Sequence, residues 1–136
     1  MSKVPLYLDT SAVLRAVLET GASPEIEDRI ANASVLVTSR LSLVESARAM
    51  HRVRSTSGVS ERDIADAQRE LTRLWSRCEI WELTEPVCRL AAEVAPGARL
   101  RTLDALHVAT FVRARERIPG LELLTADARM RAAAGS

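Results

Sequence analysis

The strongest constraint on the fold is a continuous apolar run at residues 5–8, which ends abruptly in Asp9 and two hydroxyl residues, Thr10 and Ser11. A run that does not alternate is typical of a central strand of a parallel sheet, because such a strand is buried on both faces. Asp9 then lies at the carboxyl end of the strand, where open α/β sheets bind their ligands. The sequence alone leaves open whether Asp9 works in a site or whether Asp9 or Ser11 only caps the helix that follows.

Three further apolar runs alternate with helical patterns along the chain. The runs lie at residues 34–38, 80–83 and 121–124. The helical patterns cover residues 12–19, a segment that begins at Pro24, and residues 40–54, 60–77, 85–95, 102–117 and 128–133. Strands that alternate with helices predict an α/β fold with a parallel sheet and right-handed crossovers. At 136 residues, the chain has the length of one domain.

Composition argues against a membrane protein and gives no sign of nucleic-acid binding. The net charge is +1, the mean hydropathy is -0.01, and charged residues interrupt every long apolar stretch. No apolar signal core follows Lys3, so we expect a cytoplasmic protein. Cys78 and Cys88 lack the spacing of a metal site and are predicted to be reduced core residues.

Glu45 lies in a helical segment, residues 41–47, that otherwise contains only apolar and small residues. An ionised carboxylate in such a place must be paired, bound to a cation, or exposed at an edge. The simplest structural explanation is an ion pair with Arg48, three residues further along the helix. The other explanation is that the helix carries Glu45 into a site.

Two more carboxylates lie near the predicted carboxyl edge of the sheet. Asp104 occupies the first turn of the helix 102–117, where the helix dipole favours a negative charge. Asp127 follows the fourth apolar run as Asp9 follows the first, and it can cap the last helix. Each residue has a structural explanation, but four carboxylates at one end of a sheet also fit a shared site.

Such a group of carboxylates needs a positive charge or extra protons. Two carboxylates about 4 Å apart repel by about 4 kcal/mol at an effective dielectric constant of 20. Oxygen ligands are those that Mg²⁺ and Mn²⁺ prefer, and these ions bind phosphates and activate water. No motif of a serine hydrolase, a P-loop or a dinucleotide site competes with this hypothesis. His107, one turn after Asp104, can orient a carboxylate or simply pack in its helix.

Four segments in order resemble the PIN-domain ribonucleases, and more narrowly the VapC toxins of bacterial toxin-antitoxin pairs. They are residues 8–11 (LDTS), Glu45 in a Leu-Val-Glu helix, residues 102–109 (TLDALHVA) and residues 124–127 (LTAD). The match covers essentially the whole chain, and every acidic position of the pattern is present. The resemblance implies a three-layer α/β/α fold over residues 1–136, with a central, mainly parallel sheet of four to five strands.

The resemblance also implies a function and a site. Asp9, Glu45, Asp104 and Asp127 would hold one or two Mg²⁺ or Mn²⁺ ions, with Ser11 and Thr125 in support. His107 is a further candidate for support because of its position one turn after Asp104. The substrate would be RNA, cut by metal-activated water to leave a 5′-phosphate and a 3′-hydroxyl. The same resemblance implies a homodimer and a small cognate antitoxin that blocks the cleft. It does not indicate which RNA is cut.

Two other functions stay open at this point. An aspartate after the first strand also suits a phosphotransfer domain in which Asp9 accepts the phosphoryl group, although the acidic motifs of such domains are missing. A non-catalytic interaction module would use the same residues only as helix caps. Saturable Mn²⁺ binding that depends on Asp9 and Asp104 would distinguish a metal-dependent enzyme from such a module.

Overall fold

The computed structural model describes residues 3–56 and 58–135 of the chain. Strands and helices alternate along most of it, as the apolar runs predict. In chain order the elements are β1 (Leu6–Leu8), α1 (Thr10–Val17), α2 (Pro24–Asn32), β2 (Leu36–Ser39), α3 (Arg40–Arg54), α4 (Glu61–Arg77), β3 (Cys78–Trp81), α5 (Glu85–Ala91), α6 (Thr102–Arg117), β4 (Glu122–Leu124) and α7 (Ala128–Ala134). Among the described residues, no helix is both long enough and apolar enough to cross a membrane.

The four strands form one parallel sheet in the order β3-β2-β1-β4. Tyr7 of β1 pairs with Val37 of β2 on one side and with Leu123 of β4 on the other. The chain moves outward from β1 through β2 to β3 and then crosses back to place β4 on the free side of β1. The strand order therefore reverses between β1 and β4, which is where open α/β sheets form a ligand crevice.

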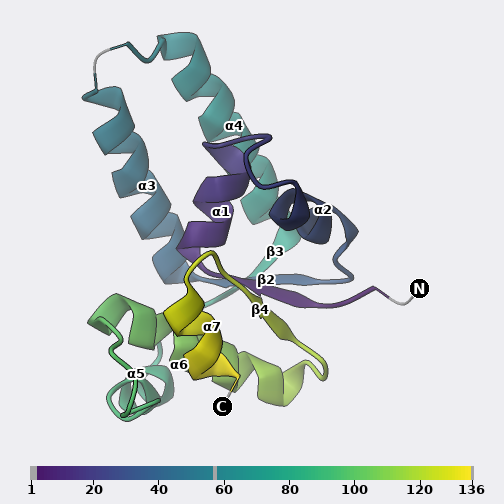
Figure 1. Cartoon of the computed structure of the whole chain (residues 1–136), viewed down its shortest axis with the longest axis vertical. Coiled ribbons are helices and arrows are strands. Elements are labelled where there is room, and N and C mark those ends of the chain that lie inside the picture. Colours follow the sequence, from purple (N-terminus) through teal and green to yellow (C-terminus); the bar gives the residue numbers. More distant parts are fainter. Residues whose placement is uncertain (1–2, 57, 136) are drawn as a thin grey trace.

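Helices cover both faces of the sheet, so the predicted three-layer α/β/α fold is confirmed (Figure 1). Leu6, Leu8 and Leu36 point to one face and pack with apolar residues of α1 to α4. Tyr7 and Val37 point to the other face and pack against α6. Alternate residues of a strand point to opposite faces, so the apolar run of β1 feeds two cores at once.

The third strand and the helix after it differ from the sequence prediction. The strand covers Cys78–Trp81 instead of residues 80–83, because it pairs only with β2 and that strand ends at Ser39. Helix α5 ends at Ala91 rather than continuing to residue 95, and Ala95 adopts a left-handed φ of 45°. A residue in that conformation cannot continue a right-handed helix.

The two cysteines are free, as predicted, but they are not both core residues. Cys78 opens β3 and is half-buried, and burial raises the pKa of its thiol to about 11. Cys88 is exposed on α5, so its prediction as a core residue was wrong. The sequence shows that the two cysteines lack the spacing of metal ligands, but it does not show which face of the short helix α5 carries Cys88.

Candidate functional site

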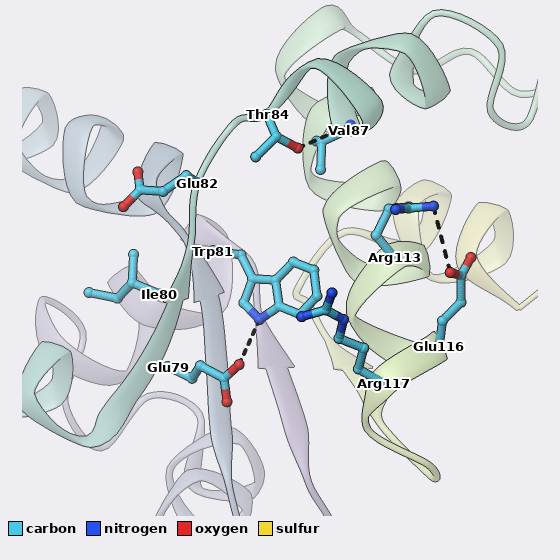
Figure 2. A pocket seen from close by; sticks show the side chains of 9 residues that line it. All are labelled: Glu79, Ile80, Trp81, Glu82, Thr84, Val87, Arg113, Glu116 and Arg117. Carbon is cyan, nitrogen blue, oxygen red and sulfur yellow. Dashed lines mark hydrogen bonds and ion pairs between the residues drawn. The ribbon is translucent and has the colours of Figure 1, made fainter.

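A hollow of about 380 Å³ lies beside edge strand β3 and α6 (Figure 2). Trp81 lines it, with its indole N–H donated to Glu79 at 3.0 Å and the Arg117 guanidinium 5.8 Å from the ring centroid. Arg113 and Glu116 form an ion pair at its rim. The aromatic ring already has a cation against it, and the hollow contains none of the four predicted site carboxylates.

Asp9 lies at the carboxyl end of β1, beside β4, and only 3% of its surface is exposed. Its Oδ1 atom accepts hydrogen bonds from the backbone N–H of Ala12 at 3.0 Å and from the Ser11 hydroxyl at 2.8 Å. Its Oδ2 atom accepts one from the Thr125 hydroxyl at 2.6 Å. Asp9 is therefore the N-cap of α1 and also belongs to a polar cluster between two strands, so the two explanations of this residue do not exclude each other.

The charge of Asp9 is not fully compensated by these contacts. Burial raises the pKa of the Asp9 carboxyl, and the hydrogen bonds from Thr125, Ala12 and Ser11 only partly oppose this effect. A carboxylate in this position gains from any nearby cation, because the ionised form is the one that burial disfavours.

Asp127 joins the same cluster through its backbone rather than through its carboxylate. Its N–H donates to the Thr125 hydroxyl at 3.0 Å, and the N–H of Ala126 donates to the Ser11 hydroxyl at 2.9 Å. The Asp127 side chain caps α7 by accepting from the N–H of Arg129 at 2.9 Å. Burial acts to raise the pKa of this carboxyl, but the interactions with Arg129 outweigh it and leave the pKa below its usual range.

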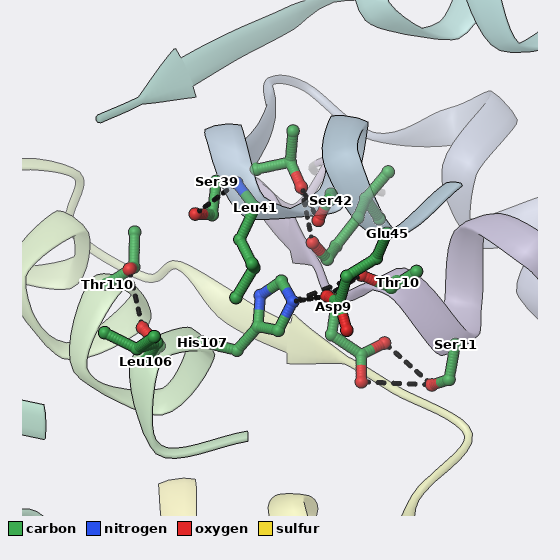
Figure 3. A network of polar contacts seen from close by, with 12 residues as sticks. Asp9, Thr10, Ser11, Ser39, Leu41, Ser42, Glu45, Leu106, His107 and Thr110 are labelled. Carbon is green, nitrogen blue, oxygen red and sulfur yellow. Dashed lines mark hydrogen bonds and ion pairs between the residues drawn. The ribbon is translucent and has the colours of Figure 1, made fainter. Parts of the chain in front are cut away.

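Glu45 is half-buried on α3 and points toward β1 and α6 (Figure 3). Its Oε1 atom accepts a hydrogen bond from the Thr10 hydroxyl at 2.5 Å and lies 2.8 Å from Nε2 of His107. The ion pair with Arg48 that would explain Glu45 structurally is not formed within the described residues. Burial acts to raise the pKa of Glu45, but hydrogen bonds from His107 and Thr10 lower it below the usual value.

His107 is both a packed helix residue and a partner of a carboxylate. Only 2% of its surface is exposed, and its Nδ1 atom lies 2.9 Å from the hydroxyl of Tyr7. The two rings meet edge to face, with centroids 6.0 Å apart. Its Nε2 atom faces Glu45 and lies 3.2 Å from the Thr10 hydroxyl (Figure 3). The imidazole therefore connects the buried strand β1 to the Glu45 carboxylate.

Asp104 lies apart from these contacts. It is partly buried in the first turn of α6, one turn before His107, and its carboxylate has no hydrogen-bond or ion-pair partner in the described part of the chain. Across residues 3–56 and 58–135, no three histidine, cysteine, aspartate or glutamate side chains converge into a group that could hold a metal ion. The structure thus joins Asp9 to Ser11 and Thr125, and Glu45 to His107, but leaves the carboxylates of Asp104 and Asp127 outside both clusters.

Sequence reasoning missed two members of the cluster around Glu45 and His107, namely Thr10 and Tyr7. From the sequence, Thr10 is only one residue of the polar segment after β1, although its position next to Asp9 places a hydroxyl at the same edge of the sheet. Tyr7 is likewise only one residue of an apolar strand. Its hydroxyl is the only side-chain polar atom in β1, and a buried tyrosine hydroxyl generally needs a partner, so that signal was available.

Comparison with known proteins gives one consistent result. The model of the family described as PIN domain matches residues 6–136. Ribonuclease VapC35 of Mycobacterium tuberculosis is 33% identical over 131 residues, which cover 95% of this chain and 89% of that protein.

Two solved structures have the same fold at lower identity. VapC20 of Mycobacterium tuberculosis, described as a sarcin-ricin loop cleaving toxin, is 20% identical with a TM-score of 0.67, and the match covers 94% of each chain. A chain of a toxin-antitoxin complex from Klebsiella pneumoniae is 18% identical with a TM-score of 0.63, over 90% of this chain and 86% of that one. These two similarities support the fold alone.

Proposed function

Because the chain belongs to the PIN-domain family, we propose that it is a metal-dependent endoribonuclease and the toxin of a bacterial toxin-antitoxin pair. The observation that carries the proposal is the position of Asp9. Its buried carboxylate lies at the carboxyl end of β1, at the point where the strand order reverses. The relative that is 33% identical is named a ribonuclease, which agrees with chemistry at this edge.

The proposed ion is Mg²⁺ or Mn²⁺, in one or two copies, held by Asp9, Glu45, Asp104 and Asp127. The residue types fit, because all four supply the oxygen ligands that these ions prefer. When bound, such an ion supplies an activated water for in-line attack on a phosphodiester and stabilises the leaving oxygen. An ion shared by all four carboxylates would require their side chains to lie closer together than they do here.

The other polar residues of the site hold the carboxylates in place. Ser11 and Thr125 donate hydrogen bonds to Asp9, while Thr10 and His107 hold Glu45. Hydrogen bonds to carboxylate ligands orient them and tune their affinity for a metal. We assign these four residues to support rather than to the reaction itself.

The proposed substrate is RNA, and arginines near the carboxyl edge would contact its phosphates. Arg99 and Arg101, which precede α6, are exposed and have no ion-pair partner among the described residues. Three other arginines near this edge are already paired within the chain, as Arg15–Glu19, Arg40–Glu82 and Arg129–Asp127. Arg99 and Arg101 are therefore the better candidates.

The proposed partners are a second copy of the chain and a small antitoxin that blocks the cleft, in the cytoplasm. The Klebsiella pneumoniae structure with the same fold is described as a toxin-antitoxin complex, and the proposal of an antitoxin extends that description to this chain. The homodimer follows from the family resemblance, and the cytoplasm is the location expected from the sequence.

Of the two other functions, the phosphotransfer domain agrees less well with the structure than the interaction module does. In a phosphotransfer domain the acceptor aspartate must be open to attack, whereas Asp9 is buried and both of its carboxylate oxygens accept hydrogen bonds. The interaction module stays the second candidate, because no three metal-ligating side chains converge among the described residues.

The test is cleavage of total cellular RNA by the purified chain, free of any antitoxin. The reactions contain Mg²⁺, Mn²⁺ or a chelator, and they include Asp9→Asn and Asp104→Asn. We expect discrete fragments that require the metal and both aspartates. Equal cleavage by Asp9→Asn would overturn the mechanism. A folded wild type that neither cleaves RNA nor binds Mn²⁺ would favour the interaction module.

A further inference from the structure

A chain of hydrogen bonds runs from the interior of the sheet to the Glu45 carboxylate. Tyr7, fully buried in β1, lies 2.9 Å from Nδ1 of His107, and Nε2 of that histidine lies 2.8 Å from Oε1 of Glu45. The ring of Tyr7 is itself fixed edge-on against Phe111, with centroids 5.9 Å apart. The chain therefore begins on a rigid part of the core and ends on a carboxylate at the edge of the sheet.

The partners of Glu45 determine the direction of these hydrogen bonds. An ionised carboxylate only accepts, so the hydrogen in the contact with Glu45 must be on Nε2 of His107. The Thr10 hydroxyl uses its one hydrogen for Glu45, so it can only accept from Nε2 in its 3.2 Å contact with His107. In a neutral imidazole Nδ1 is then an acceptor, and Tyr7 is the donor to it.

We propose that Tyr7 and His107 are positioning residues, which fix the Glu45 carboxylate in the orientation that RNA cleavage requires. This inference rests on the proposed function. Tyr7 selects the imidazole tautomer with its hydrogen on Nε2, and His107 then holds Oε1 of Glu45 together with Thr10. Partners behind a metal ligand set its orientation in this way in other proteins. Neither residue contacts the substrate in this arrangement.

The test compares variants that remove one hydrogen bond each. Tyr7→Phe removes the hydroxyl and keeps the buried ring, and we expect kcat to fall about tenfold, with KM for RNA changed less than about twofold. His107→Gln keeps an N–H donor for Glu45, whereas His107→Leu keeps none. We expect His107→Gln to retain about ten times more kcat than His107→Leu. His51→Gln, at the exposed histidine of α3, is the matched control and should equal wild type.

A second measurement does not depend on activity. Long-range ¹H–¹⁵N NMR of the metal-free protein reports which imidazole nitrogen carries the hydrogen, and the chain has only two histidines, so His51→Gln assigns the signals. We expect the hydrogen of His107 on Nε2 in the wild type and a loss of that preference in Tyr7→Phe. A purely space-filling tyrosine would leave the tautomer unchanged.

The outcomes separate this inference from the proposed function. A His107 hydrogen on Nδ1 in the wild type would overturn the inference, and so would a folded Tyr7→Phe variant whose kcat and His107 tautomer match the wild type, or equal kcat values for folded His107→Gln and His107→Leu. If the wild type cleaves no RNA but the tautomer shifts in Tyr7→Phe, the proposed function fails and the hydrogen-bond chain stands. If His107→Leu does not fold, Tyr7→Phe and the NMR spectrum decide the question.

Discussion

The Thr125 hydroxyl donates a 2.6 Å hydrogen bond to Oδ2 of Asp9, which joins the carboxyl ends of β4 and β1. The two residues lie 116 positions apart in the sequence, and they follow the edge strand β4 and its parallel neighbour β1. The same hydroxyl accepts from the backbone N–H of Asp127 at 3.0 Å, so one side chain ties the carboxylate of Asp9 to the backbone of Asp127.

Removing this hydroxyl should lower stability. Thr125→Val keeps the shape of the side chain but removes one hydrogen bond to the buried Asp9 carboxylate and the acceptor of the Asp127 N–H. We expect the free energy of unfolding to fall by about 1 to 3 kcal/mol, measured by urea denaturation. Thr72→Val is the control, because that threonine is exposed on α4 and should change stability by less than about 0.5 kcal/mol. Equal effects at the two positions would contradict the role of Thr125.

Stability should depend on pH through Asp9, in a direction that the burial of its carboxyl determines. Burial raises the pKa of Asp9 in the folded state, so the folded protein binds this proton more tightly than the unfolded chain does. The contribution of Asp9 to the stability of the folded state is most favourable at low pH, and it is lost as the pH rises through the pKa of Asp9 in the folded protein.

Asp9→Asn removes the buried charge, and the uncharged side chain can still accept from the N–H of Ala12. We expect a higher Tm than wild type at pH 7 without metal, and a difference that shrinks as the pH falls toward the unfolded pKa. The measurement is a series of thermal unfolding curves, with Asp28→Asn on the exposed face of α2 as the control. A lower Tm for Asp9→Asn at pH 7 would show that its hydrogen bonds outweigh its burial.

The sequence predicted the fold well where local patterns determine it. The helix at residues 40–54 begins and ends as predicted, because Ser39 caps its first turn and the chain changes direction after Arg54. The limits of β3 could not be predicted, because they depend on which residues of β2 remain free to pair. Pairing register is a property of two strands and is absent from the apolar pattern of one.

The four carboxylates of the candidate site could be proposed from the sequence, but their contacts could not. Asp9 and Asp127 follow apolar runs, and Glu45 lies in an apolar helical stretch, so each could be selected from local sequence. The contact of Tyr7 with His107 depends on how α6 packs across β1, and the two residues are 100 positions apart in the sequence. The Asp104 carboxylate, which has no partner among the described residues, likewise depends on the position of a whole helix.

A glycine before β4 offers a test of the turn that positions Thr125. Gly120 has a φ of 81°, and a Cβ atom there would meet no other atom within 4 Å. Gly120→Ala should therefore cost about 1 to 2 kcal/mol through its backbone conformation alone. Gly97→Ala is the matched control, because its surroundings are equally open and its φ is not left-handed. Comparable free energies of unfolding for the two variants would contradict this explanation.

Binding of RNA should depend on Arg101 more than on arginines elsewhere. Arg101 is exposed at the start of α6 and has no ion-pair partner in the described chain. Arg73 lies on another helix, α4, where it pairs with Glu70 of the same helix. In an Asp9→Asn background, which prevents cleavage, Arg101→Ala should weaken binding of single-stranded RNA several-fold. The slope of log affinity against log salt should fall by about 0.7, because one phosphate contact is lost. Arg73→Ala should leave both values unchanged, and equal losses from the two variants would mean that RNA is held by overall charge and not at this edge of the sheet.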